Sequence, residues 1–297
     1  MLSLETAALT DEHRAECAGL LAERFSRQRA AEPLLPEIES FGAHVPQTGV
    51  VALRGGKLVA YVAGEVRGDT ATVGFGGCAA IVPEAIRDCF ATAAAEWGVR
   101  RFSVAVPVFE HELIDAWFRL AFGCHFVWAV RPAEAIELAE FGGHIRPGTP
   151  DDLDAAIMFD RLVWDTQAGS PGFSELESPS LDAVRTEWRR VLGNPELYTH
   201  FVADRDGRPI GHALLYRRPP GNLRVPEASI DLVQLATVPE LRGSGIGRAL
   251  VEHATTYAHL NGYTSLLTEW SSVSLAASRF WPRRGFRSQY LRLYRAV

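Results

Sequence analysis

The residues best suited to binding an anion form a glycine-rich turn, Arg242-Gly243-Ser244-Gly245-Ile246-Gly247, with Arg248 directly after it. An apolar strand predicted at 229–238 precedes the turn, and a helix predicted at 245–261 follows it. Such a turn directs several backbone N–H groups at one point, where the helix dipole adds partial positive charge. Glycines allow positive φ angles and close approach of a ligand to the backbone. We therefore expect a site for a pyrophosphate group here, with the two arginines adding fixed charge.

Two common phosphate-binding motifs do not fit this turn. A P-loop places a lysine after its last glycine, whereas Arg248 follows Gly247. The dinucleotide-binding motif G-x-G-x-x-G has a different glycine spacing and lies within repeated parallel βαβ units, which the predicted order of elements lacks. The turn is therefore neither a P-loop nor a Rossmann fingerprint.

Two carboxylates in the neighbouring predicted strands are candidates for acid–base chemistry. Asp231 lies eleven residues before Arg242 in an otherwise apolar strand, and partial burial there would raise its pKa. Asp231 has a structural alternative, in which it caps a bulge or pairs with an arginine. Glu269 ends the next predicted strand, 264–269, and is the second candidate general base.

In this context the turn resembles a motif of the GNAT superfamily of N-acetyltransferases. The turn itself matches the pattern [QR]-x-x-G-x-[GA]. The preceding segment 235–241, Leu-Ala-Thr-Val-Pro-Glu-Leu, resembles the end of the family's fourth strand. The segment 278–286, Ser-Arg-Phe-Trp-Pro-Arg-Arg-Gly-Phe, resembles its late helix and closing Gly-Phe. The resemblance covers about residues 143–297.

The resemblance implies an acyltransferase that moves the acetyl group of acetyl-CoA, its co-substrate, to a primary amine. Such an amine is mostly protonated at neutral pH, so a general base, Asp231 or Glu269, is useful. The thioester oxygen becomes anionic, and the resemblance places backbone N–H donors for it at the strand end, with pantetheine alongside as an additional pseudo-strand. The residues assigned to acetyl-CoA are Leu235, Ala236, Thr237, Arg242, Gly243, Ser244, Gly245, Ile246, Gly247, Arg248 and Ser274.

The late helix departs from the family pattern N-x-x-A-x-x-F-Y, whose tyrosine protonates the departing thiolate. Ala277 and Phe280 match, but Ser274 replaces the asparagine and Trp281 replaces the tyrosine. An indole is not a useful acid, so we expect Trp281 to serve in packing. A thiolate can leave without an acid because its pKa is low, and Ser271, Ser272 or Ser274 can donate a hydrogen bond instead.

An internal repeat indicates how these residues are positioned. Segment 51–61, VALRGGKLVAY, resembles 202–212, VADRDGRPIGH, and both read as β-hairpins with a glycine turn. We therefore predict an α+β fold of two tandem GNAT-like domains, each with a mixed, mostly antiparallel central sheet flanked by helices. The predicted boundaries are 1–131 for the first domain, 132–142 for a linker and 143–297 for the acetyl-CoA-binding domain.

The first copy lacks the phosphate motif. Where the turn is expected, its sequence reads GFGGCAAIVPEAIRDCF, without an Arg/Gln-x-x-Gly-x-Gly pattern. The copy is therefore predicted to be degenerate and to buttress the second, although the sequence leaves a weak cofactor site open at Cys78–Ala80.

Acceptor recognition is expected near an insertion in the second copy. Residues 169–180 contain Glu175 and Glu177, which suits either a mobile acidic lid that attracts an ammonium group or a solvated loop. Three aromatic residues nearby suit either an acceptor slot or the core, with the core favoured: Trp164, Trp188 and Tyr198.

Composition excludes several classes of protein. The 297 residues are 47% hydrophobic and 22% charged, which is typical of a globular chain, and the net charge of −6 disfavours nucleic acid as a partner. The four cysteines have no metal-ligand spacing, so we expect neither a metal site nor disulfides. The acidic N-terminus resembles no signal peptide and no apolar run suggests a membrane partner, so a cytoplasmic location is expected.

The predicted function is thus amine N-acetylation in the C-terminal domain. The alternative is a catalytically weak acyl-CoA-binding sensor or regulatory module, consistent with the missing tyrosine and the degenerate copy. The sequence leaves the acceptor open between a small-molecule amine, an aminoglycoside-like drug, a peptide N-terminus and a thiol precursor. It also leaves open the acyl length and a homodimer.

Overall fold

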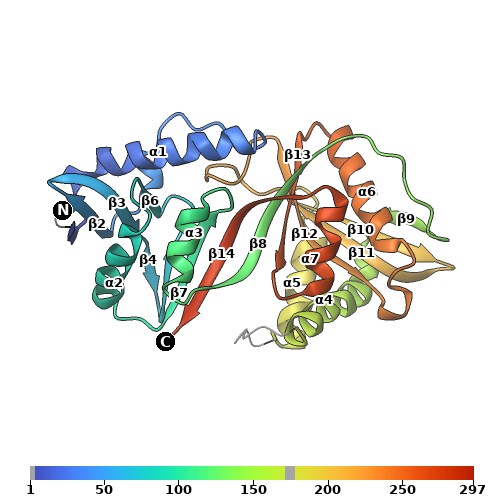
Figure 1. Cartoon of the computed structure of the whole chain (residues 1–297). Helices are drawn as coiled ribbons and strands as arrows, with labels where there is room; N and C mark the ends of the chain where they lie inside the picture. Colours follow the sequence, from blue (N-terminus) through green and yellow to red (C-terminus); the bar gives the residue numbers. More distant parts are fainter. Residues whose placement is uncertain (1–3, 171–177) are drawn as a thin grey trace. The chain divides into compact units, whose positions relative to one another are not determined.

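The computed structural model describes residues 4–170 and 178–297, which form two compact units (Figure 1). Unit 1 comprises Met1–Trp128, Gly221–Pro226 and Ser288–Val297, and unit 2 comprises Ala129–Pro220 and Glu227–Arg287. Residues 171–177 of the predicted acidic lid, including Glu175 and Glu177, lie outside the described residues. No described helix is long and apolar enough to cross a bilayer.

In unit 1, a small sheet in the order β1-β2-β3-β6 has helices on both faces. Alternate residues of β2 and β3 join two clusters, one containing residues of α2 and α3 and the other containing residues of α1. The remaining strands of the unit follow the order β4-β5-β7-β14-β8. The elements are β1 (Leu4–Ala8), α1 (Arg14–Ala31), β2 (Gly49–Arg54), β3 (Lys57–Ala63), β4 (Glu65–Arg67), β5 (Thr70–Val73), β6 (Cys78–Ala80), α2 (Ala85–Trp97), β7 (Arg101–Pro107), α3 (His111–Phe118), β8 (Gly123–Pro132) and β14 (Arg287–Ala296).

The last strand lies in unit 1, although the predicted second domain ran to residue 297. β14 pairs antiparallel with β7, with Tyr290 opposite Pro107 and Ala296 opposite Arg101. Tyr290 is fully buried in the unit 1 core, and Leu293 is fully buried there too. The contacts of the chain end therefore follow strand pairing rather than sequence order.

Unit 2 has the strand order β13-β12-β11-β10-β9. β12 and β13 are parallel, and the other pairs are antiparallel. Gly211 of β11 faces Ile246 and Leu250 of α6, whereas Leu214 joins the core cluster of α4 and α5. The elements are β9 (His144–Pro147), α4 (Leu153–Ala168), α5 (Leu181–Leu192), β10 (Tyr198–Arg205), β11 (Arg208–Tyr216), β12 (Ser229–Thr237), α6 (Ile246–Leu260), β13 (Ser265–Ser271) and α7 (Leu275–Phe280).

The two hairpins confirm the predicted repeat. β2–β3 and β10–β11 each contain one irregularity in register, between Ala52 and Leu53 and between Ala203 and Asp204, at equivalent positions. Both turns have two successive residues with positive φ, which suits a two-residue hairpin loop. The mixed sheets with flanking helices confirm the predicted α+β class.

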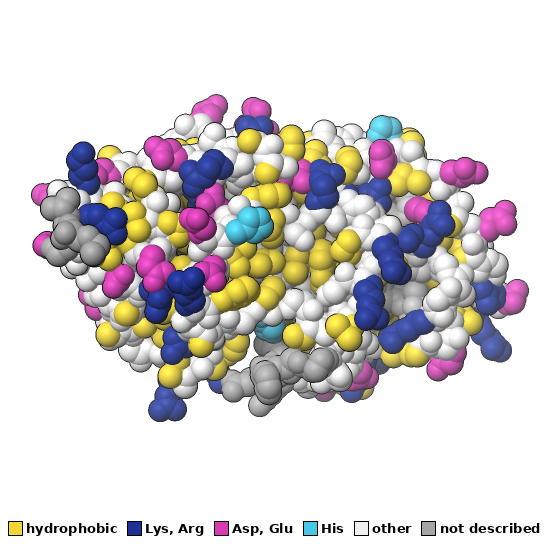
Figure 2. All heavy atoms as spheres, viewed as in Figure 1, with side chains coloured by type: hydrophobic (Ala, Val, Ile, Leu, Met, Phe, Trp, Pro, Cys, Tyr) yellow, Lys and Arg dark blue, Asp and Glu magenta, His cyan; other side chains and the backbone are white. Residues whose placement is uncertain are grey.

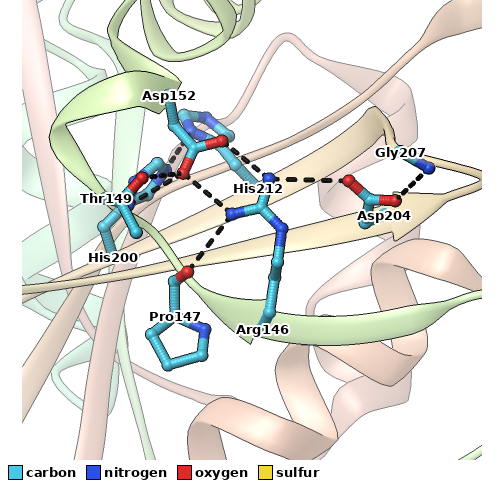
Figure 3. A network of polar contacts seen from close by, with 8 residues as sticks. All are labelled: Arg146, Pro147, Thr149, Asp152, His200, Asp204, Gly207 and His212. Atoms are coloured by element: carbon cyan, nitrogen blue, oxygen red, sulfur yellow. Dashed lines mark hydrogen bonds and ion pairs between the residues drawn. The ribbon is translucent and has the colours of Figure 1, made fainter.

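A network of polar contacts anchors the start of α4 (Figure 3). Arg146 of β9 donates two hydrogen bonds of 2.8 Å to the carboxylate of Asp152, which accepts another from the Thr149 amide. The Arg146 guanidinium lowers the pKa of Asp152 to about 2. This pairing fixes the first turn of α4 against the edge of the sheet.

Two buried histidines lie beside this network (Figure 3). Nε2 of His200 and Nδ1 of His212 are 3.3 Å apart, and the rings pack against Phe159 and Trp188. Burial lowers the pKa of His200 to about 4 and holds the pKa of His212 well below its usual range. Both imidazoles are therefore neutral at pH 7 and serve as core residues between α4, α5 and the sheet.

We predict that this pair makes the stability of unit 2 fall in mild acid. The pKa of a histidine in the unfolded chain is 6.5. Below this pH the two side chains bind protons in the unfolded chain but stay neutral in the folded protein. The free energy of unfolding should then fall between about pH 6.5 and pH 4, by up to ~1.4 kcal/mol per pH unit for each histidine. The Asp152 contribution falls only below its ordinary pKa of 3.8.

Urea unfolding across this pH range measures the slope. A His200→Gln/His212→Gln variant should lose most of it, because His44, His125 and His253 still have lowered pKa values, whereas the exposed control His259→Gln should keep it. Identical slopes in all three proteins would contradict the assignment.

Candidate functional site

The site lies in unit 2, where β12 and β13 separate. The two strands pair only from Ser229–Leu232 against Ser265–Thr268, although both continue beyond these residues. A cavity of about 680 Å³ occupies the gap and extends to the N-terminal end of α6. The walls come from β12, β13, α4, α7 and the turn before α6, and include Leu162, Val163, Thr166, Gln167, Gln234, Trp270, Ala276, Ala277 and Phe280.

The backbone of β12 supplies a hydrogen-bonding edge to this cavity. The Val238 amide bonds to the Ile210 carbonyl on the β11 side. Because backbone groups alternate sides along an antiparallel strand, Leu235 and Thr237 direct their N–H and C=O groups away from β11. Both residues line the cavity, so an extended ligand there meets a free strand edge.

The glycine-rich turn supplies unpaired amides at the cavity mouth. Gly243 and Gly245 have φ angles of +84° and +92°, which residues with a side chain rarely adopt. The first intrahelical bond of α6 runs from the Ala249 amide to the Gly245 carbonyl, and no side chain caps the helix. The amides of residues 246–248 therefore have no acceptor among the described residues.

The charged residues that line the cavity are mostly basic. Four of its lining residues are arginines: Arg242, Arg248, Arg283 and Arg284. In the space-filling view, basic side chains surround a hollow on the face of unit 2 (Figure 2). Glu269 is the only acidic residue in the described lining. The arginines suit a polyanion, and the carboxylate suits a cation or a proton.

Most of the predicted cofactor residues are brought together. Leu235, Ala236, Thr237, Arg242, Gly243, Gly245, Gly247, Arg248 and Ser274 all line the cavity. Two do not: the Ser244 hydroxyl donates to the Leu241 carbonyl at 2.7 Å, and the buried Ile246 side chain packs near Gly211.

The two predicted carboxylates occupy different environments. Asp231 is 2% exposed and is not part of the described lining. Its Oδ2 accepts a 2.7 Å bond from Nε of Arg218, whose guanidinium lies over the Tyr216 ring on the adjacent strand. Asp231 thus adopts the ion-paired alternative. Glu269 is exposed and follows Thr268, the last residue of β13 paired with β12.

The late helix places serines, and not an aromatic acid, at the cavity. The Ser274 hydroxyl caps α7 by accepting from the Ala277 amide, and buried Ser271 also lines the cavity. Trp281 is 7% exposed and packs against Phe280 and Phe286, with ring centroids 5.1 and 5.2 Å away. Its surroundings match the packing role expected for it.

The α4 residues and the Arg283–Arg284 pair lay outside the sequence assignment. Thr166 of α4 accepts a hydrogen bond from Arg242 at 3.3 Å, which joins the helix to the turn. Both arginines lie in the segment 278–286 that resembles the family, but the sequence does not predict that they line the cavity. Trp164, Trp188 and Tyr198 are not among the cavity residues, and Trp188 lies in the core.

Unit 1 fills the equivalent space internally. The pairing of Ala60–Val62 with β6 matches that of Gly211–Ala213 with Leu235–Thr237. Arg24 of α1, which is 1% exposed, donates to the Cys78 carbonyl and, at 2.5 Å, to the Phe75 carbonyl. Thr10 and Thr149 cap the first helical turn at equivalent positions in the two units. Arg24 follows Thr10 by the same number of residues as Val163, a cavity residue, follows Thr149.

The glycine turn is also missing from unit 1. The sequence Val-Pro-Glu follows both β6 and β12, but α2 begins directly after Glu84, whereas residues 241–245 separate Glu240 from α6. The Arg24 guanidinium occupies the edge of β6, and no glycine-rich turn follows this strand. Both features argue against the second cofactor site that the sequence left open at Cys78–Ala80.

We predict that Arg24→Met destabilises unit 1 by about 2–4 kcal/mol, because two carbonyls lose a charged donor in a buried site. Urea unfolding measures the loss. The exposed control Arg27→Met, which breaks only the ion pair with Glu110, should cost less than about 1 kcal/mol. Equal effects of the two substitutions would contradict the plugging role.

Comparisons with known proteins agree with this geometry. The family model "Acetyltransferase (GNAT) family" matches residues 161–286, which include β12, the glycine turn and Glu269. No curated protein sequence matches the chain.

Solved structures match over nearly the whole chain. A GCN5-related N-acetyltransferase from Sphaerobacter thermophilus has a TM-score of 0.60 at 14% identity, covering 100% of this chain and 97% of its own. A tandem GNAT protein from the clavulanic acid biosynthesis pathway has a TM-score of 0.50 at 14% identity, covering 99% and 98%. Residues 161–286 thus match the GNAT acetyltransferase family, and the fold of nearly the whole chain is similar to that of these two proteins.

Proposed function

We propose that the protein transfers an acetyl group from acetyl-CoA to a primary amine in the cavity of unit 2. The observation that carries the proposal is the continuity of the free β12 edge with the unpaired amides of α6. An extended ligand with amide groups can form hydrogen bonds with the strand edge. A diphosphate at the end of that ligand can accept hydrogen bonds from the amides of α6. Acetyl-CoA has this chemistry.

The residues fit the parts of the co-substrate in order. The amides of residues 246–248, with Arg242 and Arg248, donate hydrogen bonds to the diphosphate. Leu235 and Thr237 offer backbone groups to the amides of pantetheine. The thioester then lies toward Leu232, where β12 and β13 close, and near Glu269.

The transfer needs one proton acceptor and one oxyanion donor. Glu269, directly or through a water molecule, takes the proton from the ammonium group, and the amine nitrogen attacks the thioester carbonyl carbon. A strand-end amide stabilises the oxyanion, with Leu235 placed to donate. The carbon–sulfur bond breaks, the thiolate leaves with a hydrogen bond from Ser271 or Ser274 and takes up the second proton lost by the nitrogen, directly or through water, and the amide product forms. Asp231 is buried and outside the described lining, whereas Glu269 is exposed and part of it, so Asp231 is the less suitable base.

A second candidate is a module that binds acyl-CoA without turnover. Trp281 in the position of the family's tyrosine and the internally filled unit 1 favour it. Thiol release measured with a broad amine panel separates the two functions, because only the enzyme produces free coenzyme A thiol in an amine-dependent manner.

Cofactor binding has a matched pair of test variants. A Cβ on Gly247 would lie 3.5 Å from the Phe280 ring and 3.9 Å from Thr237, with ordinary packing and no φ strain, and Gly19 in α1 has open space. We predict that Gly247→Ala folds normally but binds coenzyme A at least ~10-fold more weakly, because the methyl enters the cradle. Gly19→Ala should bind like the unmodified protein.

Calorimetry should give one coenzyme A site per chain. Absence of binding, or equal affinity of Gly247→Ala and the unmodified protein, would contradict the cradle.

We also predict that Glu269→Gln lowers kcat by about 10²–10⁴-fold at neutral pH, because it removes the general base. Coenzyme A affinity should not change, because the diphosphate is proposed to bind Arg242, Arg248 and the amides of residues 246–248 and not Glu269. Steady-state thiol release and calorimetry measure the two effects. Unchanged turnover in Glu269→Gln together with loss in Asp231→Asn would reassign the base.

A further inference from the structure

The segment 133–142, which is part of the predicted linker 132–142, runs along α6 and is hydrogen-bonded to its neighbours; we call it the strap. Its amides at Ala133 and Ile136 bond to Thr264 and Thr256, and its carbonyls at Phe141 and Gly142 accept from Arg205. Figure 1 shows the green connection from β8 to β9 beside α6. The strap therefore runs along the helix toward the glycine turn.

One buried carboxylate joins the strap to the cavity. Glu252 of α6 is 6% exposed. Its Oε2 accepts from the Ala139 amide at 2.7 Å, and its Oε1 accepts from Nε of Arg248 at 2.6 Å. Each carboxylate oxygen thus holds one partner, and the two partners belong to different parts of the site.

One edge of the Arg248 guanidinium is hydrogen-bonded to the protein, and the other edge is available to a ligand. Its side chain is 57% exposed and lines the cavity. Nε is bound to Glu252, and the terminal nitrogens have no acceptor among residues 4–170 and 178–297. A guanidinium fixed in this way presents its remaining N–H groups in a set direction, which suits phosphate oxygens.

The strap also passes close to the turn. A Cβ built on Gly245 would lie 3.7 Å from the Glu140 carbonyl and 3.9 Å from Cβ of Phe141. The Ala139–Glu252 bond is therefore adjacent to the backbone that forms the anion cradle, and it fixes the side of the cradle that the strap covers.

We propose that Glu252 is a positioning residue for diphosphate binding: it orients the Arg248 guanidinium toward the ligand and holds the strap against the glycine turn. The inference rests on the proposed function, because its ligand is the diphosphate of coenzyme A. Glu252 does not touch that ligand and acts through Arg248 and Ala139.

Electrostatics alone gives the opposite expectation, which makes the proposal testable. Glu252→Gln removes a negative charge near a site for a polyanion, so Coulomb's law alone would tighten binding. The amide oxygen of glutamine can still accept from Ala139, but its NH₂ group cannot accept from Arg248. Orientation is then lost while the strap is retained.

The experiment measures coenzyme A binding by calorimetry, with thermal unfolding to check the fold. We expect Glu252→Gln to raise the Kd roughly five- to tenfold and Glu252→Ala to raise it further, because the alanine also releases the strap. Pantetheine, which lacks the diphosphate, should bind all variants alike. Glu187→Gln on α5, which also removes the partner of a helical arginine, should change neither affinity.

A double variant completes the test. In an Arg248→Gln background, Glu252→Gln should cause no further loss, because its effect passes through Arg248. An unchanged or lower Kd for Glu252→Gln, or a separate loss in the double variant, would overturn the proposal. Absence of coenzyme A binding by the unmodified protein would instead overturn the proposed function, and the positioning role with it.

Discussion

The structure depends on backbone groups that unit 2 leaves without internal partners. A buried or half-buried N–H or C=O group normally finds a partner, because an unpaired one costs free energy. β12 leaves its edge open where β13 diverges, and α6 begins without a side-chain cap. α4 and α7 line this gap without filling it, so the missing hydrogen bonds are available to a ligand of matching length and charge.

The two units resolve the same constraint in different ways. In unit 1 the guanidinium of Arg24 bonds to the carbonyls at the position where unit 2 has an open edge. The residue at the equivalent helix position in unit 2 is Val163, which has no group to bond to the strand. Unit 1 thus has an arginine where unit 2 has a valine, and it lacks the five residues that precede α6. These two differences distinguish the filled strand edge of unit 1 from the open edge of unit 2.

Local features of the site could be predicted from sequence because they depend on neighbouring residues. The glycine turn needs positive φ angles at Gly243 and Gly245, and the hairpin turns carry their own signals. The pairing of Asp231 with Arg218 depends instead on the register of β12 against β11, which no local pattern specifies. The same holds for the strap bond between Ala139 and Glu252, and for the pairing of β14 with β7.

Hydrogen exchange at the unpaired amides of unit 2 is the most direct test of whether a ligand binds to them. Exchange rates measured with and without coenzyme A should show slower exchange at Leu235, Thr237 and residues 246–248. The equivalent β6 amides, at Cys78 and Ala80, should not change. Unchanged exchange at the unit 2 amides, or equal protection in both units, would contradict the account.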